Sequence, residues 1–377
     1  MIQSPGILLT ILAFALVIGP LVFLHELGHY LAGRIFGVKA EEFSIGFGRE
    51  IAGITDRRGT RWKFSLLPLG GYVRFAGDMN PASQPSPEWL QLPASERAKT
   101  FQAKPLWQRA IIVAAGPIMN FLIAIVILSA FAFMFGENRT PSVVGTVLQG
   151  SAAAKAGLAP GDRITGLGGR TVETYSDMVQ FTQLRPNEPV RITFVRGGAE
   201  RSVDAVIGAR LERDRFGNEY RIGQLGIGAA GSTQVPVSLI EAPLVGLRTT
   251  ADIVRMTVDG LGQIITGRRS VSELGGPLKI AQVSGERLSM GPIEFAFLIA
   301  LVSINLGFIN LLPVPVLDGG HLLFYAVEAV RRRPVEPQVM EWAFRGGMLA
   351  ILALMLFVTL NDLGAFGVWR HLAGLIG

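Results

Sequence analysis

The sequence predicts a multi-pass α-helical membrane protein with about four transmembrane helices, one inserted β-rich domain with short helices, and a membrane-associated β-hairpin. Of its 377 residues, 49% are hydrophobic and only 17% are charged, which is too apolar for an ordinary soluble domain. The apolar residues gather in four long stretches. A more polar segment with strand-like patterns separates the second stretch from the third.

The four apolar stretches cover residues 1–24, 110–136, 295–317 and 346–361. A helix needs about 20 apolar residues to cross a bilayer, so the first three are long enough and the fourth becomes so if it continues past Asp362. We therefore expect transmembrane helices within 1–35, 106–136, 293–325 and 344–366. The alternative for the first stretch is a cleaved signal peptide, but it is too long and lacks a basic start.

Lysine and arginine residues are concentrated in two connecting segments. Residues 36–105 contain ten of them, and residues 331–345 begin with three consecutive arginines. Basic loops favour the cytoplasmic side, so we expect these two segments in the cytoplasm and residues 137–292 on the opposite side. In a bacterial inner membrane that side is the periplasm. The net charge of +6 lies mostly beside apolar segments, which disfavours a nucleic-acid binder.

Residues 140–230 have the pattern of a small β-rich domain. SVVGTVL (142–148), VRITFV (190–195) and RSVDAVIGARL (201–211) have strand composition, and SDMVQFTQL (176–184) predicts a short helix. The segment AGLAPGDRI (156–164) resembles the signature of bacterial PDZ domains. That resemblance implies one PDZ domain that binds peptide C-termini by strand addition, with its binding edge near residues 143–148.

The segment 231–292 contains an amphipathic pattern. Leu244, Leu247, Ile253, Val254, Val258, Leu261 and Ile265 are spaced as one face of a helix. We expect this helix to rest on the bilayer surface or on the β-rich domain.

The chemistry is concentrated at HELGH, where the first apolar stretch ends. His25 and His29 are four residues apart, so both imidazoles project from one face of a helix and can bind one metal ion. Glu26 is placed to take a proton from water at that metal. Two satisfied polar histidines would be the plainer interpretation, but ionisable groups within a membrane are costly and are seldom without function.

A third metal ligand is expected because zinc usually takes three protein ligands at a catalytic site. The chain has no cysteine, and His371 lies in a C-terminal tail that favours an ordinary surface position. Asp318 follows Pro313 and Pro315, which break a helix, and such breaks line polar cavities in membranes. A helix cap is the alternative role for Asp318. The role of His321 stays open.

Three motifs in chain order resemble the site-2 protease family, in particular its bacterial regulator-of-sigma-E protease branch. They are HELGH, GPIMNF (116–121) and NLLPVPVLDGG (310–320), and PLGGYVRFAGD (68–78) and ELGGPLKIAQVSGE (273–286) also match. The resemblance implies a zinc endopeptidase that cuts the transmembrane segments of single-pass proteins. His25, His29 and Asp318 would hold zinc, Glu26 would be the base, and Asn310 would handle substrate.

The same resemblance implies partners. These are anti-sigma factors or leftover signal peptides as substrates, and another protease that makes the first cut. Some members of the branch carry two PDZ domains, whereas this chain has room for one.

The segment WKFSLLPLGGYVRF (62–75) predicts a β-hairpin with its turn at or near residues 69–72. We expect Gly70, Gly71 and Tyr72 to contact substrate, because an exposed strand edge can pair with an unwound helix.

Three other functions compete with this interpretation. A membrane-anchored PDZ scaffold with a structural metal would not need Glu26. A soluble zincin with a membrane tether would need a third ligand soon after HELGH, and FSIGFG (43–48) supplies none. A transporter would be expected to carry an internal repeat, which the four apolar stretches lack.

Overall fold

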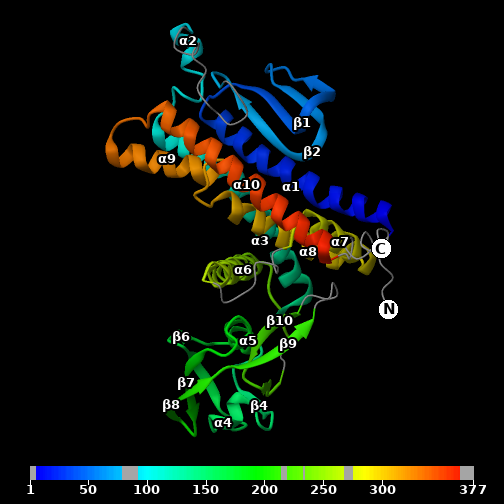
Figure 1. Cartoon of the computed structure of the whole chain (residues 1–377), viewed down its shortest axis with the longest axis vertical. Coiled ribbons are helices and arrows are strands. Elements are labelled where there is room, and N and C mark those ends of the chain that lie inside the picture. Colours follow the sequence, from blue (N-terminus) through cyan, green and yellow to red (C-terminus); the bar gives the residue numbers. More distant parts are fainter. Residues whose placement is uncertain (1–5, 79–91, 214–218, 232–233, 267–274, 366–377) are drawn as a thin grey trace, which may run out of the picture. The chain divides into compact units, whose positions relative to one another are not determined.

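The computed structural model describes residues 6–78, 92–213, 219–231, 234–266 and 275–365. The chain forms two compact units (Figure 1). The first combines Met1–Leu128 with Gly275–Leu360, and the second combines Ser129–Leu274 with Asn361–Gly377. Residues 273 and 274, which begin the motif at 273–286, lie outside the described residues.

Among the described residues, four helices are long and apolar enough to cross a membrane, as the sequence predicts. They are α1 (Ile7–Ile35), α3 (Leu106–Phe135), α8 (Pro292–Asn310) and α10 (Pro337–Ala365). Large apolar side chains along them remain uncovered by protein, such as Ile7 at 80%, Val126 at 67% and Leu349 at 68% exposed. Apolar surface of this extent is stable next to hydrocarbon rather than water. The chain is a multi-pass membrane protein.

The third predicted span, 293–325, is two helices in the structure. α8 ends at Asn310, residues 311–317 are not helical, and α9 (Asp318–Arg331) begins at the predicted third ligand. Pro313 and Pro315 lie in this break, as expected from residues that cannot continue a helix. α7 (Pro277–Met290) precedes α8, and α2 (Ala94–Arg97) is a single turn between the hairpin and α3.

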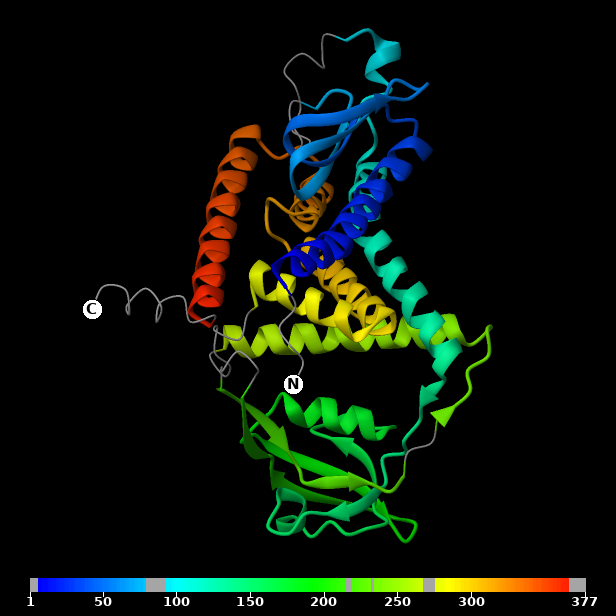
Figure 2. The ribbon, with the colours of Figure 1, turned by 90° about the vertical axis from the view of Figure 1, so that its right-hand side faces the viewer.

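The β-hairpin is larger than the sequence predicts. It consists of β1 (Ala40–Thr55) and β2 (Arg61–Phe75), which lie beside α1 in both views of the ribbon (Figures 1 and 2). Its turn is at residues 56–60, where Oδ1 of Asp56 accepts hydrogen bonds from the backbone amides of Arg58 (2.8 Å) and Thr60 (3.0 Å). The expected turn at 69–72 is wrong, because Gly70, Gly71 and Tyr72 lie within β2.

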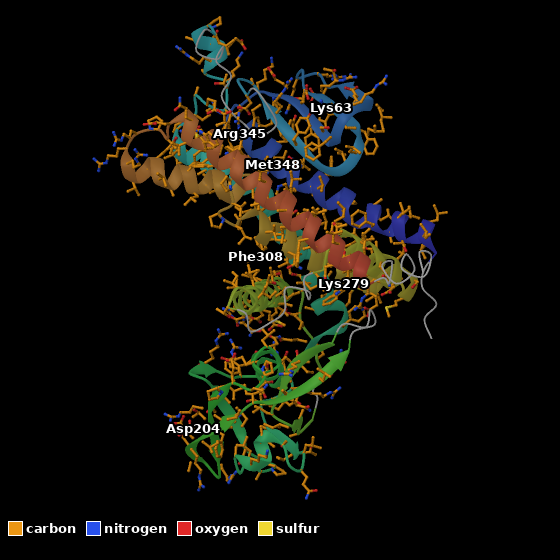
Figure 3. All side chains as sticks on the ribbon, in the orientation of Figure 1. Lys63, Asp204, Lys279, Phe308, Arg345 and Met348 are labelled. Atoms are coloured by element: carbon orange, nitrogen blue, oxygen red, sulfur yellow. The ribbon has the colours of Figure 1, made fainter. Side chains whose placement is uncertain are left out.

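Strand β2 bends so that the start of β1 pairs with it twice. Residues 42–45 have one set of partners at 61–64 and a second set at 71–74. In this register, residues 71–75 pair with β1 on one side only. Lys63, labelled on this sheet in Figure 3, forms an ion pair with Glu42, which also accepts a hydrogen bond from the Tyr72 hydroxyl at 2.9 Å. These polar contacts tie the two halves of β2 together across β1.

The second unit contains a β-rich domain followed by helix α6. Its four-stranded antiparallel sheet has the order β6-β5-β7-β8, and three further strand pairs are β4-β11, β9-β10 and β3-β12. The element bounds are β3 (Glu137–Asn138), β4 (Val144–Val147), α4 (Ala152–Lys155), β5 (Arg163–Leu167), β6 (Arg170–Thr171), α5 (Tyr175–Gln183), β7 (Pro189–Arg196), β8 (Ala199–Val206), β9 (Gly208–Arg213), β10 (Glu219–Gln224), β11 (Ile227–Ala229), β12 (Gln234–Val235) and α6 (Ala242–Ile265). The strands and helix expected from the four sequence segments are all present.

Apolar side chains from the strands and α5 form the core of this domain. Ile164, Leu167 and Ile192 are completely buried in it. Thr174 and Asp177 begin α5 with reciprocal side-chain to backbone hydrogen bonds, which satisfy amides at the helix start. The predicted binding edge at 143–148 is not open at its start. Val144 bonds to Gly161 and Asp162 on one flank and pairs with Ala229 on the other.

Helix α6 forms where the amphipathic pattern predicts it, and its polar residues contact the β-rich domain. Asp259 forms ion pairs with Arg170 at 3.0 Å and Arg185 at 3.4 Å, and Gln263 donates to the carbonyl of Leu184. Leu244, a residue that is 49% exposed, belongs to the apolar face that remains uncovered within this unit.

Stability of the β-rich domain is expected to depend on one buried carboxylate. Asp162 is 1% exposed and accepts two hydrogen bonds from Arg196, at 2.6 and 2.7 Å, which hold its pKa below the usual value. Arg196→Ala leaves this charge buried, so we expect amide hydrogen exchange in β5 and β7 to rise on the order of ten-fold. Because the pKa is depressed, the stabilisation is present above about pH 4 and lost below it.

The matched control is Arg191→Ala on the same strand. Arg191 pairs with Asp204, and both side chains are about 70% exposed, so exchange should change by less than about two-fold. Equal acceleration in the two variants would contradict the role assigned to Asp162.

Candidate metal centre

Helix α1 carries the two histidines and Glu26 towards its C-terminal end, which the sequence predicts to face the cytoplasm. The helix has no break at this point, so His25 and His29 project from one face, one turn apart. Both imidazoles are nearly buried, and their Nε2 atoms lie 3.3 Å from each other. The local spacing of the motif therefore produces the arrangement that it predicts.

Asp318 reaches the histidines from the first residue of α9. The chain folds tightly just before it: a side chain on Gly319 would lie 2.3 Å from the carbonyl oxygens of Leu311 and Leu312. A side chain on Gly320 would lie 2.3 Å from the carbonyl of Val314. The two glycines thus allow α9 to start against the preceding loop. The Asp318 side chain does not cap its helix. Its carboxylate points at the two histidines instead.

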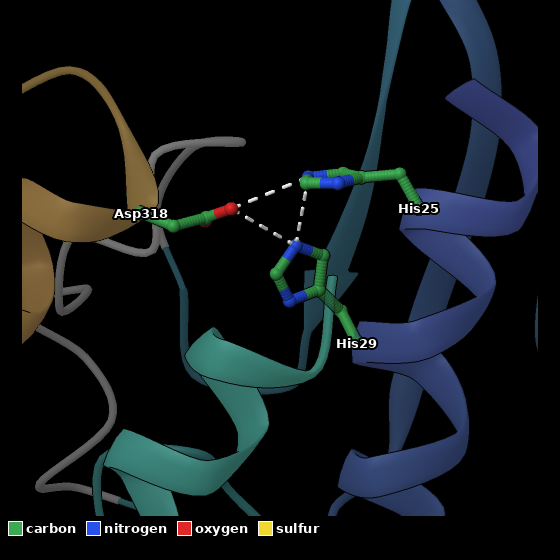
Figure 4. Close-up of side chains that lie close together, drawn as sticks. All are labelled: His25, His29 and Asp318. Atoms are coloured by element: carbon green, nitrogen blue, oxygen red, sulfur yellow. Dashed lines mark hydrogen bonds and ion pairs between the residues drawn. The ribbon is translucent and has the colours of Figure 1, made fainter. Parts of the chain in front are cut away.

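Three potential ligand atoms converge from these two helices (Figure 4). Oδ2 of Asp318 lies 3.2 Å from Nε2 of His25 and 3.5 Å from Nε2 of His29. This oxygen is buried and has no hydrogen-bond partner among the described residues. Ligand atoms bound tetrahedrally to zinc at about 2.1 Å lie about 3.4 Å from one another. The donor set and its spacing both fit zinc.

Glu26 lies between this cluster and strand β2. Its carboxylate accepts a hydrogen bond from the backbone amide of Val73. A side chain on Gly71 would lie 2.9 Å from Cγ of Glu26 and 2.8 Å from the carbonyl oxygen of Ser44. The absence of a side chain at position 71 therefore lets β2 pass directly beside Glu26.

A family model for peptidase family M50 matches residues 13–354, which include all of these residues. The chain belongs to peptidase family M50. It is 43% identical to "Putative zinc metalloprotease Atu1380" of Agrobacterium fabrum over 94% of this chain and 96% of the relative. It is also 36% identical to "Metalloprotease MmpA" of Caulobacter vibrioides over 98% of this chain and 99% of the relative.

A solved PDZ domain of an SdrC-like protein from Listeria monocytogenes is similar to 24% of this chain. The likeness covers 87% of that domain at 21% identity with a TM-score of 0.20. Membership of the M50 family, together with the His-His-Asp cluster, makes the chain a zinc metalloprotease.

The structure brings together only some of the residues that the sequence singles out. His25, His29 and Asp318 form one cluster, and Glu26 and Gly71 lie next to it. Asn310 is the last residue of α8 and is not one of the three clustered side chains. His321 packs against the ring of Phe344, with ring centroids 5.1 Å apart, and is also outside the cluster.

Helix α3 supplies contacts to the histidines that the sequence analysis missed. Nδ1 of His29 lies 2.9 Å from the carbonyl oxygen of Ile112, and Nδ1 of His25 lies 3.0 Å from the amide of Asn120. Gly116 lies between these two positions, and a side chain there would be 2.2 Å from Nε2 of His29. The available signal was GPIMNF, which contains the only asparagine of an uncharged apolar stretch.

Gly116→Ala tests whether the M50 site needs this free space. The added methyl would also lie 2.9 Å from Cε1 of His25, so both rings would have to move away from the ligand position. Alanine favours a helix more than glycine does, so the fold should persist. We expect zinc affinity of the purified protein to fall on the order of ten-fold or more, measured by chelator competition.

Gly19→Ala is the matched control, because a side chain at position 19 of α1 meets no described atom within 4 Å. Its zinc affinity should equal that of the wild type. Unchanged affinity in Gly116→Ala would show that the rings do not need the glycine.

Proposed function

We propose that this chain is an intramembrane zinc endopeptidase of the regulator-of-sigma-E protease type, which cleaves the transmembrane segments of single-pass proteins. The observation that carries the proposal is the convergence of His25, His29 and Asp318 within a unit built largely from membrane-spanning helices. Catalytic zinc sites use three protein ligands and keep a fourth position for water or substrate. Anti-sigma factors are the proposed substrates, with leftover signal peptides as a second class.

In this proposal His25, His29 and Asp318 hold the metal. Zinc, when bound, supplies a Lewis acid that polarises a carbonyl and lowers the pKa of water. Glu26 takes the proton from the attacking water and delivers it to the leaving nitrogen of the peptide. The hydrogen bond from the amide of Val73 orients the Glu26 carboxylate for both transfers.

A helical substrate must be unwound before it can be cut, because its carbonyls are hydrogen-bonded within the helix. The single-sided pairing of residues 71–75 supports β2 as the strand to which the unwound segment adds. Since the amide of Val73 is directed at Glu26, the unpaired edge of β2 runs past the proposed base. Gly70 and Gly71 have no side chains and would contact substrate through their backbone. Tyr72 would do the same, because its hydroxyl is bonded to Glu42. Asn310 would contact it from the end of α8.

The proposed topology follows from the basic loops. Residues 36–105 and 331–345 would be cytoplasmic, and the β-rich domain would be periplasmic in a bacterial inner membrane. We propose that this domain is a single PDZ domain. It would exclude substrates until another protease has trimmed them, or capture the new C-terminus. A cavity of about 660 Å³ beside Leu148 and Lys155 has room for a peptide end.

Cleavage by a Glu26→Gln variant decides between this enzyme and a PDZ scaffold with a structural metal. Glutamine keeps the size of Glu26 but cannot accept the proton, so we expect the cleavage rate of a tagged single-pass substrate to fall about 10²–10⁴-fold. Bound zinc should stay at the wild-type level, because Glu26 is not a proposed ligand. The assay uses detergent-purified protein and measures cleavage and zinc content together.

His25→Ala provides the comparison, since it should lose both zinc and cleavage. Undiminished cleavage by Glu26→Gln would eliminate Glu26 as the base. Zinc without cleavage in the wild type, across several substrates, would favour the scaffold.

The proposed substrate strand can be tested by disulfide cross-linking, because the natural chain has no cysteine. In a Glu26→Gln background, Tyr72→Cys should cross-link to a single cysteine near the cleavage position of the substrate. Ile54→Cys is the control, since Ile54 is 70% exposed but lies on the second half of β1. Equal cross-linking of both variants, read on a non-reducing gel, would count against strand addition at β2.

A further inference from the structure

One face of α3 is shaped to receive the two histidines. Residues 112, 116 and 120 are spaced four apart, so they lie along a single side of the helix. The first offers a backbone carbonyl, the second has no side chain, and the third offers an amide. Residues 112 and 120 contact the Nδ1 atoms of the two imidazoles, which do not point at Asp318, and the bare backbone of Gly116 leaves space beside Nε2 of His29.

The contact at His29 fixes which of its nitrogens carries the proton. A carbonyl oxygen only accepts, so Nδ1 of His29 donates to Ile112 at 2.9 Å. In a neutral imidazole the other nitrogen then has a free lone pair. That nitrogen is Nε2, which lies 3.5 Å from Oδ2 of Asp318. The helix therefore sets His29 in the form that binds metal.

The contact at His25 involves a side chain that can either donate or accept. Asn120 is fully buried, and its amide nitrogen lies 3.0 Å from Nδ1 of His25. The oxygen and nitrogen of an amide exchange places by a half-turn about the last side-chain bond. In the orientation that the structure records, Oδ1 of Asn120 at the far end of the amide is buried and has no hydrogen-bond partner among the described residues, so no second contact secures this orientation.

Metal binding does choose between the two orientations. If the amide nitrogen donates to Nδ1, the proton of His25 is on Nε2, where it blocks the ligand position. If the amide oxygen faces Nδ1, the proton is on Nδ1 and Nε2 is free, as in His29. The main chain of Asn120 is also fixed, because the buried hydroxyl of Ser303 donates to its carbonyl at 2.7 Å. Rotation of the amide therefore requires no movement of α3.

We propose that Asn120 is a positioning residue whose side-chain oxygen accepts a hydrogen bond from Nδ1 of His25 and thereby holds Nε2 towards the metal. It performs for His25 what the Ile112 carbonyl performs for His29. This inference rests on the proposed role of His25 as a ligand. It predicts that an acceptor is needed at position 120 and that a donor is not.

Two substitutions separate acceptor from donor. Asn120→Leu keeps the size but removes the hydrogen bond, so zinc affinity should fall about 10–100-fold. Asn120→Asp keeps only acceptors, so affinity should equal or exceed that of the wild type. Zinc affinity is measured on the full-length protein in detergent by chelator competition. The visible absorption spectrum of the cobalt-substituted protein gives a second readout, which should change in Asn120→Leu and not in Asn120→Asp.

Asn305→Leu on α8 is the chemically matched control and should leave affinity and spectrum unchanged. Wild-type affinity and spectrum in Asn120→Leu would overturn the inference. A loss in Asn120→Asp would overturn it too, since it would mean that a donor is required, and this holds even where Asn120→Leu fails to fold. Undiminished zinc binding in His25→Ala would instead overturn the proposed function, and the inference with it.

Discussion

The metal centre depends on the close approach of α1 and α3. A side chain on Gly28 of α1 would lie 2.4 Å from the carbonyl oxygen of Ala115, and one on Gly116 of α3 would lie 2.2 Å from His29. Gly28 of α1 therefore leaves space for the backbone of α3, and Gly116 of α3 leaves space for the imidazole of His29. This approach lets one helix hydrogen-bond both imidazoles, which an apolar environment requires of buried polar groups. If α1 and α3 were further apart, the histidines would lose their hydrogen-bond partners on α3, and the potential ligand atoms would no longer converge.

The approach of β2 to Glu26 follows the same principle. Gly71 lies against both Glu26 and the carbonyl of Ser44, so the strand can bring a backbone amide to the proposed base. An enzyme that unwinds a helix must offer hydrogen bonds in place of those it breaks. A strand edge beside the base offers them where the peptide would be cut. The sheet and the metal centre are therefore parts of one arrangement within the first unit.

Local features of the site could be predicted from the sequence, whereas contacts between distant segments could not. His25 and His29 share a helix, so their spacing alone places them together. Asp318 follows prolines that break a helix, which also is a local signal. The prediction of a turn at Gly70 and Gly71 was wrong. A pair of glycines in a sequence is equally consistent with a turn and with a strand position where another segment packs closely against the backbone. Asn120 was missed because nothing in its own segment indicates which residue it faces.

The proposed third ligand, Asp318, is held by backbone packed on backbone. Gly319 and Gly320 lie against the carbonyls of residues 311, 312 and 314, so the start of α9 has little freedom relative to the end of α8. Zinc sites are tight when their ligands are oriented before the metal arrives. Asp318 can have that orientation only if the loop before it stays compact, which explains why prolines and glycines surround a single carboxylate. The break between α8 and α9 thus both ends a membrane-spanning helix and places the carboxylate of Asp318 beside the two histidines.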